Sequence, residues 1–167
     1  MHRIVSLLIM LIYWHTAPAQ NKLHPCNAPE CSQFDFWVGD WDLTWNDTSK
    51  GSNSIRKILN DCVINENFSN PVNNYSGMSW SVYDPQKREW KQTWVDNQNG
   101  YIILTGKYSN GEMILSTGPV ISPQGKKVVS RMVFYHIKPD SFDWKWEAST
   151  DNLTWKVNWL IHYERKK

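Results

Sequence analysis

The amino-acid sequence predicts an all-β protein, folded as one closed, antiparallel, up-and-down barrel of about ten strands. Three observations carry this prediction. Side chains alternate with a period of two along several segments, and no window shows sustained helical periodicity. Turn signals interrupt the chain at short spacing. The composition is typical of a β protein, with 11 Trp, 7 Tyr and 5 Phe among 167 residues.

The alternation is clearest in three segments that are rich in tryptophan. In the first segment, Trp90, Gln92 and Trp94 share one face of the expected strand. The two segments near the C-terminus carry on one face Phe142, Trp144, Trp146 and Ala148, and Trp155, Val157, Trp159, Ile161 and Tyr163. We expect the aromatic face of these last two strands to be buried on one side of the sheet.

Short turns join the expected strands. Asn99-Gly100 and Asn110-Gly111 are strong hairpin signals, because Asn and Gly tolerate the positive φ of a tight turn. Strands are expected at residues 37–46, 52–59, 62–68, 75–84, 88–96, 101–108, 112–118, 127–137, 141–149 and 153–164. A meander of this length usually closes, since closure removes exposed strand edges. Residues 27–36 are expected to hold one helical turn that plugs an end of the barrel.

The first 19 residues have the pattern of a secretory signal peptide. A basic start is followed by the apolar run from Ile4 to Trp14 and by Ala17-Pro18-Ala19, the small residues that a signal peptidase reads. The apolar run is only about half of the roughly 20 residues that a membrane span needs, so an uncleaved anchor is the weaker interpretation. We therefore expect a signal peptide over residues 1–19, export to the periplasm or the medium, and a single barrel domain over residues 20–167.

Export would make disulfides permissible, and the chain has three cysteines, Cys26, Cys31 and Cys62. An odd number leaves one thiol over, and from the residues alone all three pairings are open. A bridge between Cys26 and Cys62 would tie the N-terminal segment to the early barrel. A zinc site is the alternative, but no CxxC pair and no neighbouring histidine cluster supports it, so we expect no metal.

Residues 34–41 read Phe-Asp-Phe-Trp-Val-Gly-Asp-Trp, and this motif resembles the FDFWxGxW signature of the bacterial DUF1579 family. The resemblance continues through residues 77–84 and 90–96 and covers nearly all of the chain after residue 19. It implies a lipocalin-like (calycin) barrel and gives no agreed activity. It also favours the Cys26–Cys62 disulfide and leaves Cys31 as the extra thiol.

Gly39 and Trp41 form the G-x-W that opens the first strand of barrels of this type. In such barrels the Trp packs across the closed end against an arginine of the last strand, and Arg165 stands at the end of the last expected strand. A guanidinium on an indole face would contribute roughly 0.5–2 kcal/mol. We therefore expect a structural role for these three residues.

A barrel of about ten strands has room for a ligand as well as for its own side chains. Inward-facing polar side chains are then informative, because a buried polar group needs a partner. The candidate ligand-binding residues are Glu66, Ser79, Tyr83, Gln92, Trp94 and Arg131. Glu66 opposite Arg131 could form a buried ion pair or a site that recognises a carboxylate. The alternatives are a structural polar network, outward-facing residues and, for Trp94, ordinary core packing.

Charge and the remaining motifs argue against several classes of function. The formal net charge is only +2, and the one basic run is Arg165-Lys166-Lys167, so neither nucleic acid nor an anionic membrane surface is indicated as a partner. No catalytic triad order, phosphate loop or helical H-E-x-x-H motif appears. We expect no cofactor, and haem held by His162 on the last strand is the weaker alternative.

Three functional hypotheses follow. The first is an exported barrel that binds a small apolar or aromatic molecule. The second is an enzyme, an isomerase, cyclase or hydrolase, that would use Glu66, Tyr83 or Arg131 in the cavity. The third is a structural protein of the cell envelope, which predicts a barrel filled by its own tryptophans with no cavity.

Overall fold

The computed structural model describes residues 26–46 and 48–167, so the predicted signal peptide lies outside the described residues. The chain forms short, antiparallel strands almost throughout. These are β1 (Gly39–Trp45), β2 (Ser49–Ile58), β3 (Val63–Asn70), β4 (Tyr75–Asp84), β5 (Glu89–Asp96), β6 (Tyr101–Ser109), β7 (Glu112–Ser116), β8 (Val120–Ile121), β9 (Lys127–Tyr135), β10 (Ser141–Ser149) and β11 (Lys156–Arg165). In the part of the chain that is described, no helix has the length and apolar character needed to cross a membrane.

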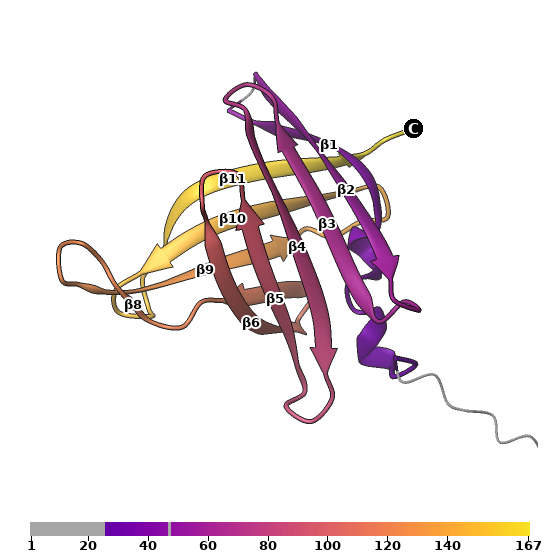
Figure 1. Ribbon diagram of the computed structural model, residues 1–167, viewed down its shortest axis with the longest axis horizontal. Coiled ribbons are helices and arrows are strands. Elements are labelled where there is room, and N and C mark those ends of the chain that lie inside the picture. Colours follow the sequence, from indigo (N-terminus) through magenta and orange to yellow (C-terminus); the bar gives the residue numbers. More distant parts are fainter. Residues whose placement is uncertain (1–25, 47) are drawn as a thin grey trace, which may run out of the picture.

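The sheet closes on itself. Strands β1 to β7 pair in chain order, β7 pairs with β9, β9 with β10, β10 with β11, and β11 returns to β1, so ten strands form a barrel. The remaining strand, β8, pairs only with β9 and stays outside the ring. Figure 1 shows the strands following one another around the barrel. The prediction of a closed antiparallel barrel of about ten strands is confirmed, while β8 was not predicted.

The N-terminal segment covers one end of the barrel. It holds two 3-10 turns, η1 (Pro29–Ser32) and η2 (Asp35–Trp37), where the sequence predicted a single helical turn. In Figure 1 these turns lie beside the end of β2 and the beginning of β3. Phe34 is fully buried, with its ring 4.8 Å from that of Trp90 and 5.5 Å from that of Phe134. This end is therefore plugged by aromatic packing.

A disulfide fastens this plug to the barrel. Cys26 is bonded to Cys62, which directly precedes β3, across a sequence separation of 36 residues. The pairing that the family resemblance favoured is therefore confirmed. Cys31 is a free thiol and is partly buried.

A register shift corrects one prediction about the last two strands. Trp146 of β10 lies opposite Trp159 of β11, but Glu147 lies opposite Val157, so Asn158 is an extra residue that forms a β-bulge. The bulge reverses which residues face inward. Trp159 lines the interior, whereas Val157 is exposed and Trp155 packs outside. The expectation that Trp155 and Val157 share the buried face was wrong for this reason.

Candidate ligand-binding site

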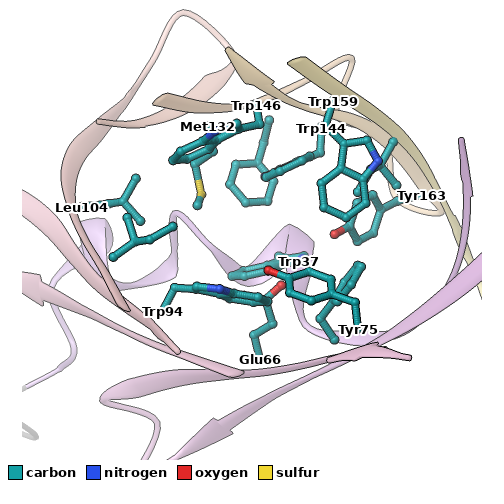
Figure 2. Close-up of a pocket in the computed structure, with 14 residues that line it drawn as sticks. Trp37, Glu66, Tyr75, Trp94, Leu104, Met132, Trp144, Trp146, Trp159 and Tyr163 are labelled. Atoms are coloured by element: carbon teal, nitrogen blue, oxygen red, sulfur yellow. The ribbon is translucent and has the colours of Figure 1, made fainter. Parts of the chain in front are cut away.

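The barrel holds a partly open cavity with a volume of about 150 Å³. Among the described residues, the polar groups of its wall are one carboxyl group, two phenol groups and the indole N–H groups of the tryptophans. The lining residues are Trp37, Glu66, Phe68, Tyr75, Trp94, Ile102, Leu104, Met132, Phe134, Trp144, Trp146, Trp159, Ile161 and Tyr163. Figure 2 shows Glu66 and Trp94 on one side of the cavity, facing Met132, Trp146 and Trp159 across it.

Five tryptophans from different parts of the chain meet in this wall. The rings of Trp37, Trp94, Trp144 and Trp159 pack edge to face with aromatic neighbours, which fixes their orientation. The ring centroid of Trp159 lies 5.8 Å from that of Trp144 and 5.7 Å from that of Phe68, with interplanar angles of 89° and 87°. The cavity is therefore bounded by aromatic side chains that are held by other aromatic side chains.

Glu66 is the charged residue of this wall and projects inward from the middle of β3. Its side chain is buried, with 6% of the residue exposed. Asn53 Nδ2 donates to Oε1 of the carboxyl at 2.7 Å, and Ser79 Oγ donates to Oε2 at 2.6 Å. Removal from water raises the pKa of Glu66 to about 7, although the two hydrogen bonds lower it.

The hydrogen bonds around Glu66 continue along the inner wall from β3 through β2 to β11, which is separated from β2 by β1. Asn53 Nδ2 also donates to the hydroxyl of Tyr163, on β11, at 3.2 Å. Burial is the main cause that raises the pKa of the Tyr163 phenol, with the Glu66 charge adding to it. Among the described residues, Oδ1 of Asn53 has no hydrogen-bond partner, and neither does the indole N–H of Trp37. A buried polar atom without a partner is uncommon in native proteins.

A second carboxylate lies beside the aromatic wall. Oδ2 of Asp96 accepts hydrogen bonds from the Tyr75 hydroxyl and from Trp94 Nε1, both at 3.0 Å. Burial would raise the pKa of Asp96, but these bonds and the backbone N–H of Gly100 hold it below its ordinary value. A methyl group at Gly77 would collide with the Trp94 ring, so this glycine lets the indole lie against β4. The hydrogen bonds to Asp96 therefore orient the side chains of Trp94 and Tyr75, and Gly77 leaves room for the Trp94 ring.

Three of the six predicted binding residues meet at this site. Glu66 and Trp94 line the cavity, and Ser79 is hydrogen-bonded to Glu66. Gln92 is buried nearby on the inner face of β5, where its Nε2 donates to Ser81 Oγ at 2.9 Å. Tyr83 belongs to the plugged end, where its ring lies 5.7 Å from that of Trp90 in a separate, more polar groove.

Arg131 does not reach the cavity, and the predicted pairing with Glu66 is wrong. Its neighbour Met132 faces inward, so Arg131 faces outward from β9. The guanidinium forms a salt bridge with Glu147 and stacks on Trp155, with its Cζ atom 3.7 Å from the ring centroid. Sequence alternation alone gave no sign of which carboxylate would lie beside it.

The residues that were expected to be structural lie at the plugged end. The Arg165 Cζ atom lies 4.2 Å from the centroid of the Trp41 ring. Its Nη1 donates to the carbonyl of Val38 at 2.9 Å, and its Nη2 to that of Pro139 at 3.0 Å. Gly39 has a φ of 140°, and a side chain there would meet the Arg165 guanidinium. The guanidinium thus links the last strand to the residue that precedes β1 and to the loop between β9 and β10.

His162 lies on the outer face of β11, because its neighbour Tyr163 lines the cavity. Its Nδ1 is 2.8 Å from Oδ1 of Asp143, and the Nδ1 of His136 is 2.8 Å from Oδ2 of the same carboxylate. His162 therefore cannot serve as an axial ligand inside the barrel, and the haem alternative through this residue was wrong. Within residues 26–46 and 48–167, no group of three or more His, Cys, Asp or Glu residues could hold a metal ion.

Four important residues of the site were not among the predicted ones. Tyr75 and Tyr163 bring hydroxyl groups to the cavity, and Trp37 lines it from the plug. Asn53 donates hydrogen bonds to Glu66 and Tyr163. A signal was present for Tyr163, which shares strand parity with Ile161 and Trp159. No comparable signal marked Asn53, since the segment around it is polar on both faces.

Comparisons with known proteins agree with this architecture. A crystal structure of Rv2717c from M. tuberculosis is similar, with a TM-score of 0.56 and 10% sequence identity over 84% of this chain and 99% of that chain. At this identity the likeness concerns the fold alone. No curated protein matches the sequence. A family model described as "Protein of unknown function (DUF1579)" matches residues 33–165, which is most of the chain. The protein therefore belongs to the DUF1579 family.

Proposed function

We propose that the protein is an exported barrel that binds a small, mostly apolar or aromatic molecule. The observation that carries the proposal is the aromatic cavity with a single buried carboxyl group in its wall. Ligand sites in proteins are concave, mainly apolar and furnished with a few polar groups that fix the orientation of the ligand. Glu66, held in place by Asn53 and Ser79, would supply such a polar group.

The size of the cavity restricts the ligand. A volume of about 150 Å³ is comparable to that of an engineered, apolar cavity that binds benzene. We therefore expect the buried part of the ligand to be one ring or a branched group of similar size. The hypothesis of a purely structural barrel predicts an interior filled by its own tryptophans and no cavity. The cavity of about 150 Å³ argues against this hypothesis.

The disulfide supports the exported location. Bonds of this kind persist in oxidising compartments and are rare in the cytosol of most organisms. The Cys26–Cys62 bond joins the plug to the barrel, so its formation would complete the closed end after export. We propose the periplasm or the medium as the location, in agreement with the predicted signal peptide.

A titration followed by tryptophan fluorescence tests the binding function. Small aromatic and branched apolar molecules should change the emission of the five cavity tryptophans. Leu104→Phe should weaken binding because it fills part of the cavity, whereas Ile103→Phe, on the adjacent exposed position, should not. Native mass spectrometry of the purified protein would identify a retained ligand. If no compound alters the emission and the protein carries nothing, the proposal is wrong.

An enzyme acting on a small molecule is the second candidate, and one observation favours it. Burial raises the pKa of Glu66 to about 7, which suits a residue that must both accept and donate a proton near neutral pH. Glu66→Gln keeps the size of the side chain and removes this capacity. If a substrate is found, the variant should bind it and fail to convert it; unchanged turnover would exclude Glu66 as the acid or base.

A further inference from the structure

The buried carboxyl group of Glu66 has no cationic neighbour in the described structure. No Lys, Arg or His is among the described residues that line the cavity. The hydrogen-bond donors to Glu66, Asn53 and Ser79, are neutral. A buried carboxylate is costly unless a positive charge accompanies it. Among the described residues, the ionised Glu66 side chain therefore has no positively charged partner. A cationic ligand could provide one.

The rest of the wall is suited to a positive charge. A cation within about 6 Å of an aromatic ring centroid is attracted to the ring face, and Trp is the strongest partner. Five Trp, two Tyr and two Phe side chains surround the space in front of Glu66. The aromatic faces and a carboxylate without a cationic partner together favour a cation over an anion or a purely apolar molecule.

We infer that the cavity binds a small organic ammonium ion, with Glu66 as its counter-ion and the tryptophans of the wall around its alkyl or aryl groups. This inference rests on the proposed binding function and names the class of its ligand. The cavity volume of about 150 Å³ accommodates a head group about as large as a benzene ring. Asp96 adds a second negative charge beside Tyr75 and Trp94, which would favour entry of a cation.

Binding of a cation should depend on pH through Glu66. The other ionisable groups of the cavity are the phenols of Tyr75 and Tyr163, whose pKa values are raised by burial and which stay neutral below pH 9. With a pKa of about 7, Glu66 is mostly protonated at pH 6 and mostly ionised at pH 8. A cation binds the ionised form, so its apparent affinity should increase about tenfold from pH 6 to pH 8.

Matched pairs of ligands test the inference by isothermal titration calorimetry on the oxidised, full-length barrel. Choline is compared with 3,3-dimethylbutan-1-ol, its neutral counterpart, and butylammonium is compared with butan-1-ol. We expect at least one cation to bind about tenfold or more tightly than its neutral counterpart at pH 8. Glu66→Gln should abolish this preference and the pH dependence. Glu164→Gln, which removes an exposed carboxylate from the outer face of β11, is the control for net charge and should change neither.

The outcomes separate this inference from the proposed function. If the alcohols bind as tightly as the cations in both the unchanged protein and Glu66→Gln, the cation inference is overturned while the binding function stands. If neither member of any pair binds and small aromatic molecules also fail, both are overturned. An affinity for choline that is the same at pH 6 and pH 8 would likewise contradict a role of Glu66 as counter-ion.

Discussion

We expect Glu66→Gln to make the empty protein more stable at alkaline pH and to remove one component of its pH dependence. Burial raises the pKa of Glu66 from an ordinary value of 4.5 to about 7 in the folded protein. Between these two values the folded protein holds a proton that the unfolded chain has released. The stability from this group is therefore fully present below pH 4.5 and is lost as the pH rises through 7.

The magnitude follows from the difference between the two pKa values. Each pH unit corresponds to 1.36 kcal/mol, so the change from 4.5 to about 7 amounts to about 3 kcal/mol. This is a large share of the roughly 5–15 kcal/mol that stabilise a typical domain. Glutamine has the same shape, stays neutral and can still form hydrogen bonds with Asn53 and Ser79. The variant should thus gain up to about 3 kcal/mol over the unchanged protein at pH 8 and about none at pH 4.5.

Urea unfolding at intervals between pH 5 and pH 8.5, with the disulfide intact, measures this difference. All other titratable groups are common to the two proteins, so subtraction of the two free energies of unfolding isolates Glu66. The free energy of the unchanged protein should fall relative to that of the variant over this range, with equal m-values. Two parallel curves, or a variant that loses stability at pH 8, would refute the reasoning from burial.

Three further predictions concern the stability of the barrel and the aromatic wall of its cavity. Replacing Cys26 and Cys62 by Ser should lower the free energy of unfolding by about 4 kcal/mol, because the bond closes a long loop in the unfolded chain; urea unfolding of oxidised and variant protein measures it. Gly39→Ala should cost roughly 1–3 kcal/mol, seen as a lower Tm, since a φ of 140° suits glycine alone. Trp159→Ala should weaken binding of any cavity ligand in calorimetry, whereas Trp155→Ala, on the outer face, should leave its affinity unchanged.

Much of the fold could be predicted because strands and tight turns follow patterns that are local in the sequence. The strand predicted at residues 141–149 has the bounds of β10, since alternating aromatic residues are followed by a polar turn. Asn99 and Asn110 have positive φ values of 64° and 53°, as the hairpin signals required. The start of β11 was predicted three residues too early, at residue 153, because Asp151 accepts backbone hydrogen bonds from Leu153 and Thr154 and extends the turn.

The interior of the barrel was harder to predict, because alternation shows two faces without saying which one is inside. A single bulge at Asn158 reverses the two faces, so Trp155 and Trp159 lie on opposite sides of the wall. No feature of the segment marks the bulge. Long-range partners were equally hidden: Asn53 reaches Tyr163, 110 residues later, because β1 between them pairs with both β2 and β11.

Two buried glutamates illustrate what separates a structural site from a functional one in this barrel. Glu147 is 1% exposed and Glu66 is 6% exposed, and both belong to strands that carry aromatic or apolar residues. Glu147 is paired with Arg131 and Lys145, so its charge is balanced within the described wall. Glu66 faces an aromatic space and has only neutral hydrogen-bond donors. A fold that needed a polar residue at Glu66 only for stability would be served better by an apolar one, since unpaired burial of a charge is destabilising. The carboxyl group is therefore better explained by a ligand than by the stability of the barrel.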